Sequence, residues 1–322
     1  MKNISVLCGG VGGSKLAVGL ASCDVSSTVV VNTGDDFSLY GLQICPDIDT
    51  VLYSLTGRAH AGQGWGRADE SFKVQEELND LGEAIWFQLG DRDIALHLLR
   101  ANLLSGGASL SHTTQEIGTR FGAPCAIVPM SDSPVPTMVE CDAGVISFQE
   151  YFVKHRCAPV VSRLHYGGSS ASASPEALAA LTNPQLDGVV ICPSNPVLSI
   201  GPILAIESLK NALLGRRVPA LAVSPLIAGN AVKGPTRKIL IELGIEPTAV
   251  EVARLYKGLI DVFVLDEVDE HHANDIKSLG MEVVVAPTLM QTFEDKVRLA
   301  TLCVATLERF QASQSVNVSA QE

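Results

Sequence analysis

The chain has 322 residues, of which 47% are hydrophobic, 18% charged and 5% aromatic. This apolar fraction can fill a sizeable core, and it excludes intrinsic disorder over most of the chain. With 35 acidic and 23 basic side chains, the formal net charge of −12 excludes a general nucleic-acid-binding surface, because an acidic protein repels the phosphate backbone.

Neither a membrane span nor a secretory signal is predicted. No window approaches the roughly 18 consecutive apolar residues that a spanning helix needs. The apolar run Ile4–Cys8 stops at Gly9, which makes it too short for the core of a signal sequence. The eight cysteines form no CxxC pair, so we expect reduced thiols and no thiolate zinc site. Together, these features predict a soluble, cytoplasmic protein.

The first 35 residues predict a βαβ unit. A strand is predicted at Ile4–Cys8, a helix over Ser14–Leu20 and a second buried strand at Thr28–Asn32, with a glycine turn after the first strand. This order implies a parallel sheet with a right-handed crossover.

Short apolar runs that each end in a turn or a proline continue the pattern. Further strands are predicted at Ala126–Val128, Gly188–Cys192, Ala220–Ser224, Asp261–Leu265 and Glu282–Ala286. Helical spacing occurs at Asp91–Leu104, Pro175–Leu181, Pro202–Leu214 and Phe293–Phe310. The alternation predicts a doubly wound, Rossmann-like α/β fold with a parallel sheet.

Two stretches interrupt this alternation. Residues 136–165 predict a small antiparallel β add-on, with strands at Thr137–Cys141, Val145–Val153 and Pro159–His165, before a flexible linker, Gly167–Ser174. Residues 233–258 predict a helical insertion, with helices at Thr236–Leu243 and Pro247–Leu255. We therefore expect a single α/β domain over residues 1–310 and a polar, disordered tail over residues 311–322.

The glycine turn is suited to phosphate. Glycines let the backbone approach a ligand closely, and they leave helix N–H groups pointing at it; they are Gly9, Gly10, Gly12 and Gly13. The dinucleotide fingerprint fails, because Lys15 stands where its third glycine belongs and Asn32 stands where its ribose-binding acid belongs. The nucleoside-triphosphate loop also fails, because Ser14 occupies a glycine position. The alternative is a tight turn without a ligand.

Acidic side chains follow at the same carboxyl edge of the predicted sheet. Asp35 and Asp36 come after the second strand, and Asp47 and Asp49 form an Asp-x-Asp pair farther along the chain. Such carboxylates repel one another unless a divalent cation lies among them, and Mg²⁺ binds one or two carboxylates together with phosphate oxygens. Alternatively, Asp35 caps a turn and Asp49 caps a helix that starts near Thr50. As a set beside the glycine turn, they favour a metal.

The start of the predicted helix at Asp91 carries further candidates. Asp91 is expected to cap that helix, and Asp93 can contact His97 one turn later, a pair that is more often structural than catalytic. Arg92 can clamp an anion or stack on a planar ring. Trp65, between two glycines, suits stacking on a ligand, and a plain core anchor is the alternative.

Two strand-to-helix loops carry small polar groups that can contact a base or a ribose. The first contains Ser194 and Asn195, and the second runs from Ser224 to Gly229. Lys233 is a further candidate for phosphate.

In chain order, these motifs resemble one family. They are Cys8–Lys15, Asn32–Asp36, Cys45–Thr50, Gly64–Arg67, Leu89–Asp93, Pro193–Pro196 and Ser224–Gly229. Over about residues 1–310 the sequence resembles the 2-phospho-L-lactate transferase family of coenzyme F420 biosynthesis, the CofD/FbiA type.

The resemblance implies an enzyme that transfers a phosphorylated three-carbon acid moiety from a GDP-linked donor to the deazaflavin alcohol Fo. The moiety is phosphoenolpyruvyl, 2-phospholactyl or 3-phosphoglyceryl, and the sequence leaves this choice open. GMP is released, and coenzyme F420-0 or its dehydro form results. The resemblance also implies Mg²⁺ as cofactor, a homodimer, and a functional link to the guanylyltransferase that makes the donor.

The resemblance also implies roles for individual residues. Residues expected to bind the diphosphate are those of the glycine turn with Ser14 and Lys15. Asp35 and Asp49 are expected to hold the metal, with Asp47 and Asp36 as alternates, and one carboxylate can accept the ribityl proton. Arg92 is expected to act with Asp35 and Asp49 in catalysis. Asp49 and Arg92 are expected to contact Fo, and Trp65 and Asp36 are expected to bind substrate. Those expected on the guanosine side are Ser194, Asn195, Ser224 and Gly229.

A different class of protein remains the alternative. The YvcK-like proteins, which are non-catalytic nucleotide- or sugar-nucleotide-binding regulators, share the glycine turn and the Asn-x-x-Asp-Asp stretch. The segments Gly90–Asp93 and Cys45–Thr50 favour the transferase.

Overall fold

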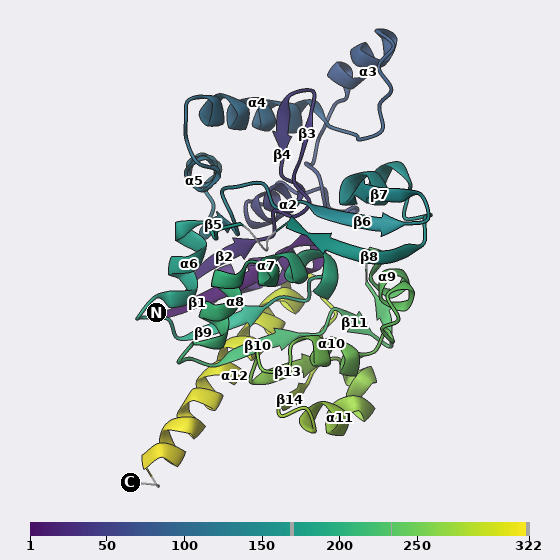
Figure 1. Ribbon diagram of the computed structural model, residues 1–322. Coiled ribbons are helices and arrows are strands. Elements are labelled where there is room, and N and C mark those ends of the chain that lie inside the picture. The colour runs from purple at the N-terminus through teal and green to yellow at the C-terminus, as the bar shows by residue number, and fades with distance from the viewer. Residues whose placement is uncertain (168–170, 233, 320–322) are drawn as a thin grey trace.

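A seven-stranded parallel sheet forms the centre of the computed structural model, which describes residues 1–167, 171–232 and 234–319 (Figure 1). Part of the predicted linker and Lys233 lie outside these residues. The strand order is β14-β13-β10-β9-β1-β2-β5. The strands are β1 (Lys2–Cys8), β2 (Val25–Val31), β5 (Ala126–Pro129), β9 (Gly188–Ile191), β10 (Ala220–Val223), β13 (Val262–Leu265) and β14 (Glu282–Val285).

The order of the strands creates a switch point between β1 and β9. The chain runs outward from β1 through β2 to β5, and then returns to β9 on the other side of β1. In open α/β sheets, ligands bind outside the carboxyl ends of the strands at such a point. The predicted doubly wound, Rossmann-like sheet is confirmed.

Helices cover both faces of the sheet, and successive residues of β1 alternate between them. Val6 and Cys8 belong to one apolar core, whereas Leu7 belongs to the other. The first core packs α1 (Gly10–Ala21), α2 (Pro46–Leu55), α4 (Asp91–Ser105), α5 (Leu110–Phe121) and α12 (Phe293–Ser319). The second packs α6 (Pro175–Thr182), α7 (Gly201–Ala205), α8 (Glu207–Leu214), α9 (Thr236–Glu242), α10 (Ala249–Leu255) and α11 (Ala273–Lys277).

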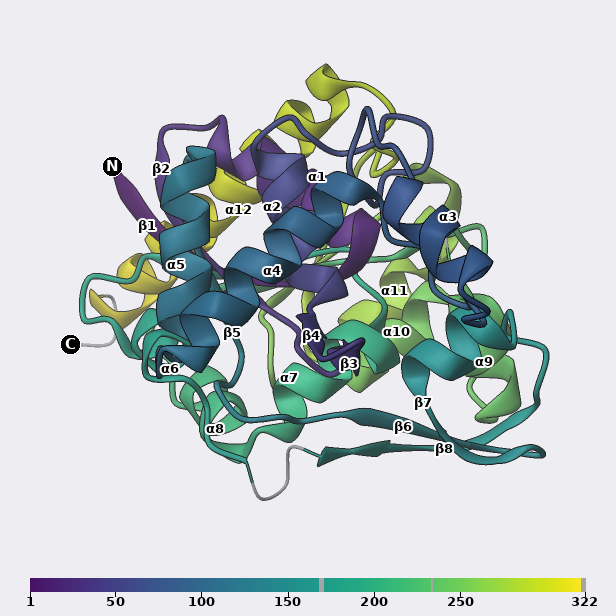
Figure 2. The same cartoon turned by 90° about the horizontal axis from the view of Figure 1, so that it is seen from above.

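The antiparallel add-on is present as a three-stranded sheet along one side of the molecule (Figure 2). Its order is β7-β6-β8, and its strands are β6 (Thr137–Cys141), β7 (Gly144–Ser147) and β8 (Val161–Tyr166). The prediction of one strand over Val145–Val153 was wrong. β7 ends at Ser147, and a π-helical turn follows at Glu150–Lys154, in which Tyr151 is buried.

Two predicted helix boundaries also differ. The helix predicted at Pro202–Leu214 breaks at Ile206, whose ψ of 107° is extended. A π-helical turn, Pro196–Ile200, precedes α7. α12 continues to Ser319, through most of the predicted tail.

Within residues 1–167, 171–232 and 234–319, no single helix is long and apolar enough to cross a membrane. The segments Pro196–Ala205 and Glu207–Leu214 reach that length and composition only as a pair, and the pair is bent by 91°.

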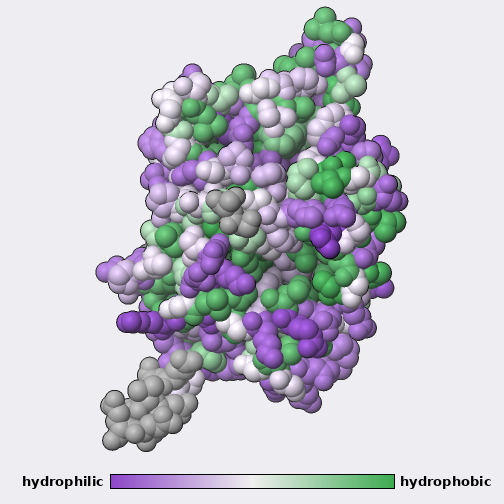
Figure 3. All heavy atoms as spheres, in the orientation of Figure 1, coloured by the Kyte–Doolittle hydropathy of each residue, from purple (hydrophilic) through white to green (hydrophobic). Residues whose placement is uncertain are grey.

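Several short elements escaped the sequence pattern. They are the hairpin β3 (Phe37–Leu39) and β4 (Leu42–Ile44), the helix α3 (Lys73–Asp80), the hairpin β11 (Leu226–Ile227) and β12 (Asn230–Ala231), and the 3₁₀ turn Glu267–His272, besides α5 and α11. α3 projects from the body of the molecule and buries no residue (Figure 1). Hydrophobic atoms are visible on this projection (Figure 3), where Val74 and Leu81 are exposed.

α1 and α12 cross at Gly19. A Cβ at this position would overlap the Lys296 carbonyl oxygen and lie 3.0 Å from the Ala300 Cβ. The backbones therefore approach more closely than any larger residue allows.

We expect Gly19→Ala to lower the free energy of unfolding by about 1–3 kcal/mol, because the added methyl group forces the helices apart. Gly118→Ala in α5 is the matched control, since its Cβ would meet only the Ala123 Cβ, at 3.7 Å. That variant should be neutral or up to about 1 kcal/mol more stable, through helix propensity. Urea unfolding measures both, and equal effects would contradict the close crossing.

Candidate active site

The loops after β1 and β9 are tied together at the switch point. Gly9 precedes α1, and its N–H donates to Ser194 Oγ over 3.1 Å. The Ser194 hydroxyl donates in turn to the Gly9 carbonyl oxygen over 2.8 Å. The next amide, that of Gly10, donates to Asp47 Oδ1 over 2.8 Å, and Gly10 has a positive φ of 64°. A carboxylate of α2 thus lies on the glycine turn.

Close packing accounts for the glycines. A Cβ at Gly12 would overlap the Pro193 carbonyl oxygen, and one at Gly13 would overlap Ser194 Oγ. A Cβ at Gly9 would lie 2.5 Å from Asp47 Oδ2. The glycines are therefore required by the fold itself, without a ligand. α1 begins at Gly10, and the first amides of a helix have no intrahelical acceptor, so the Val11 and Gly12 amides are candidates to bind an anion.

Asn32 is the centre of the carboxylate cluster. Its Nδ2 donates to Asp35 Oδ1 over 2.8 Å and to Asp47 Oδ2 over 2.9 Å. Its Oδ1 accepts the Gly34 N–H over 2.8 Å. Asp35 and Asp47 are both buried. Two of the predicted metal ligands are thus brought together around a single amide.

Burial raises the pKa of each carboxyl in this cluster. The pKa of Asp35 is well above its ordinary value, first through burial and then through the charge of Asp47. Burial raises the pKa of Asp47 to about 6, although hydrogen bonds from Asn32 and Gly10 oppose the shift. The pKa of Asp36 is also raised by burial, and its Oδ1 is buried without a hydrogen bond. Burial therefore disfavours the charged forms of these carboxyl groups, and a bound cation would favour them.

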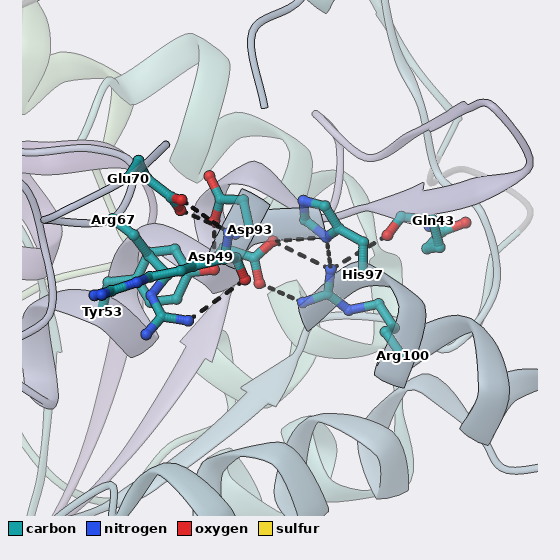
Figure 4. Close-up of polar contacts among 9 residues, drawn as sticks. Gln43, Asp49, Tyr53, Arg67, Glu70, Asp93, His97 and Arg100 are labelled. Carbon is teal, nitrogen blue, oxygen red and sulfur yellow. Dashed lines mark hydrogen bonds and ion pairs between the residues drawn. The ribbon is translucent and has the colours of Figure 1, made fainter. Parts of the chain in front are cut away.

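Asp49 lies apart from this pair and is bound by Arg100 (Figure 4). Arg100 is 1% exposed; its Nη2 contacts Asp49 Oδ1, and its Nη1 donates to Asp49 Oδ2 over 3.1 Å. His97 Nδ1 lies 3.0 Å from Arg100 Nη1 and 3.8 Å from Asp49 Oδ2. Burial lowers the pKa of His97 to about 4, so this imidazole is neutral at physiological pH.

The structure changes two expectations for these residues. α2 begins at Pro46, so Asp49 is not the cap of a helix that starts near Thr50. Asp47 and Asp49 lie in the first turn of α2, where the helix dipole favours negative charge. Among the residues that the structure describes, no group of three His, Cys, Asp or Glu side chains is arranged to hold a metal.

The predicted contact between Asp93 and His97 is replaced by a contact between helices. Asp93 Oδ1 accepts the hydroxyl of Tyr53, which lies on α2, over 2.5 Å. Burial raises the pKa of Asp93 to about 6. His97 instead joins Asp49 and Arg100.

The start of α4 is held by a carboxylate from another segment. Glu70 accepts the N–H groups of Arg92 and Asp93 over 2.8 and 2.9 Å. Asp91 does not cap its own helix; it accepts the amides of Lys73 and Val74 and thereby caps α3. Gly90 is the N-cap of α4. The side chain of Arg92 is exposed and forms no ion pair with the described residues.

Trp65 lies in an exposed loop near the start of α4. The loop is closed by a β-bridge between Ala59 and Arg67. Trp65 is 50% exposed, between Gly64 and Gly66, which both have positive φ. The exposed placement excludes the core-anchor alternative and leaves the indole available for stacking.

The residues predicted for the guanosine side are held by contacts within the protein. Asn195 Oδ1 accepts the amides of Val197 and Leu198, and Ser224 Oγ exchanges hydrogen bonds with the backbone of Leu226. Gly229, with a φ of 69°, belongs to the turn between β11 and β12. Together with Ser194, these side chains shape their loops.

Ser14 and Lys15 also have partners inside the protein. The buried Ser14 hydroxyl donates to the Val11 carbonyl oxygen over 3.0 Å. Lys15 Nζ donates to the Met290 carbonyl oxygen over 2.7 Å. Lys15 therefore reaches the segment before α12.

Sequence reasoning missed Arg100, Tyr53, Glu70 and the central role of Asn32. A signal existed for Arg100, because Asp93, His97 and Arg100 recur at helical spacing and form a polar stripe on one face of α4. No comparable pattern marks Tyr53 or Glu70.

We expect Arg100→Met to lower the free energy of unfolding by about 3–5 kcal/mol, because it leaves the Asp49 carboxylate buried and unpaired. The double variant Asp49→Leu/Arg100→Met removes both charges and should recover most of the loss. Urea unfolding of the wild type, both single variants and the double variant gives the coupling. Additive losses would contradict a buried ion pair.

Comparisons with known proteins identify relatives along nearly the whole chain. The family model described as 2-phospho-L-lactate transferase CofD matches residues 4–295. A phosphoenolpyruvate transferase of Kitasatospora aureofaciens is 38% identical over 316 residues, which cover 95% of this chain and 98% of that protein. A 2-phospho-L-lactate transferase of Methanosarcina barkeri is 37% identical over 306 residues, with 94% and 98% covered.

A solved structure supports the fold. The crystal structure of a UPF0052 family member from Bacillus halodurans superposes with a TM-score of 0.62, at 17% identity, and covers 94% of this chain and 98% of that one. At this identity the likeness concerns the fold alone. The family match and the two relatives confirm the resemblance seen in the motifs: the chain belongs to the CofD family of 2-phospho-L-lactate transferases.

Proposed function

We propose that this chain transfers a phosphorylated three-carbon acid moiety from a GDP-linked donor to the deazaflavin Fo in coenzyme F420 biosynthesis. The observation that carries the proposal is the CofD match over residues 4–295, with relatives named as transferases of phosphoenolpyruvate and of 2-phospho-L-lactate. Because these relatives are 38% and 37% identical, the comparison leaves the acid open.

The geometry of the switch point supports this chemistry. The amides of Val11 and Gly12 at the start of α1 are suited to the diphosphate of the donor. The carboxylates of Asp35 and Asp47 lie beside the same turn. Negative charge of the donor would therefore meet helix amides on one side and acidic side chains on the other.

Asp35 and Asp47 are the residues that would hold Mg²⁺, because both are buried beside the glycine turn and accept hydrogen bonds from the same Asn32 amide group, and neither forms an ion pair within the described residues. When bound, Mg²⁺ would neutralise charge on the diphosphate. Asp49 is less suited, since both of its oxygens contact Arg100.

The transfer itself is a displacement at phosphorus. The ribityl hydroxyl oxygen of Fo forms a bond to the phosphorus that carries the acid, and the bond from this phosphorus to the bridging oxygen breaks. The electron pair leaves with GMP, and a carboxylate of Asp35 or Asp36 accepts the hydroxyl proton. The protein contributes mainly position and charge, as is typical of phosphoryl transfer.

Fo would be contacted from the α4 side of the site. Arg92 and Trp65 are both exposed there, and they offer a guanidinium and an indole for a planar ring. The proposal also includes that two copies of this chain form a homodimer.

We expect Asp35→Asn to lower kcat at least about 100-fold while the fold is retained, because the change removes charge but little volume. The assay mixes Fo with each GDP-linked donor and Mg²⁺, measures GMP, and identifies the product by mass spectrometry. Asp24→Asn is the control, since Asp24 is exposed and lies between the end of α1 and the start of β2, whereas the glycine turn lies at the start of α1. Wild-type protein that releases no GMP in the presence of Fo would contradict the proposed function.

We expect Mg²⁺ to raise the melting temperature more at pH 8 than at pH 5. The folded pKa of Asp47 is about 6, above its unfolded value, so the folded protein binds the extra proton at low pH and loses this stability as pH rises through 6. Above pH 6 the charged cluster binds Mg²⁺, which restores stability.

Asp47→Asn should remove most of this response to Mg²⁺. NaCl at matched ionic strength is the control for screening. An equal response at both pH values, or an unchanged response in Asp47→Asn, would contradict a cation at Asp35 and Asp47.

A further inference from the structure

Tyr53 joins α2 to the start of α4. Its side chain is 1% exposed, and its hydroxyl donates to Asp93 (Figure 4). Asp93 directly follows Arg92, and the amides of both residues donate to Glu70. The hydroxyl of Tyr53 therefore holds the helical turn from which Arg92 extends.

The ring of Tyr53 also contacts the loop that carries Trp65. The Arg67 guanidinium carbon lies 5.6 Å from the centre of the Tyr53 ring and 5.5 Å from that of Phe121. Arg67 closes the Trp65 loop through its β-bridge, and its Nη1 donates to the Arg92 carbonyl oxygen over 3.4 Å. One buried ring thus holds both segments.

The same helix carries the carboxylates at the switch point. Asp49 and Tyr53 lie one turn apart on α2, and both contact α4. Asp47 instead contacts Gly10 and Asn32. Because α2 is one continuous helix, the position of Tyr53 is linked to that of Asp47.

We infer that Tyr53 is a positioning residue, which holds Arg92 and the Trp65 loop at a set distance from the carboxylates of the switch point. The inference rests on the proposed function, which assigns Arg92 and Trp65 to the acceptor Fo. Tyr53 is buried and therefore acts through these two residues rather than on the substrate.

The test is steady-state kinetics of Tyr53→Phe, with Fo and the donor varied separately. Loss of the bond to Asp93 should raise KM for Fo about threefold to tenfold, with KM for the donor unchanged. Tyr53→Leu also removes the ring that Arg67 contacts and should have a larger effect. Asp93→Asn keeps an acceptor for the Tyr53 hydroxyl and should retain a KM for Fo closer to that of the wild type.

Tyr256→Phe is the matched control. Tyr256 is also 1% exposed, but its hydroxyl makes no hydrogen bond to the described residues. Removal of this hydroxyl should leave both KM values unchanged.

The outcomes separate the two proposals. Wild-type protein without Fo-dependent GMP release would overturn the proposed function. An active wild type with an unchanged KM for Fo in Tyr53→Phe would overturn the positioning role. Equal increases in both KM values, together with a lower melting temperature, would also overturn it, because they indicate a general structural effect.

Discussion

The burial of two neighbouring carboxyl groups is the constraint on which this site depends. Asp35 and Asp47 both accept hydrogen bonds from the side-chain amide of Asn32, at the carboxyl edge of the sheet. Burial alone would favour their neutral forms, as their raised pKa values indicate. Such a pair lowers the free energy of unfolding at neutral pH unless a cation binds to it. Because burial disfavours their charged forms, these carboxyl groups are the best candidates in the site to bind a cation.

α2 links this cluster to the rest of the proposed site because its side chains serve two neighbours. Asp47 contacts the glycine turn after β1, whereas Asp49 and Tyr53 contact α4. The buried charge of Asp49 is offset by Arg100, in contrast to Asp35 and Asp47. Two carboxylates two residues apart thus differ in role, because one meets an arginine and the other meets only neutral donors.

The glycine turn shows how one feature can serve both fold and function. Gly9, Gly12 and Gly13 let the loops after β1 and β9 pack directly on each other. The same contact brings the first amides of α1 to the switch point, where an anion can reach them. Glycine content alone therefore does not separate a ligand site from tight packing, and the case for a ligand rests on the carboxylates and on the family.

The sequence by itself determined the parallel sheet, the antiparallel add-on, the family, and the placement of Asp35 and Asp47 near the glycine turn at the carboxyl edge of the sheet. Hydrophobic periodicity and short motifs are local, so they can be recognised along the chain. Only the tertiary structure decided which side chains meet: Asp49 with Arg100, Asp93 with Tyr53, and Glu70 with the start of α4. These pairs join residues far apart in sequence, and their partners depend on how helices pack, which no local pattern records.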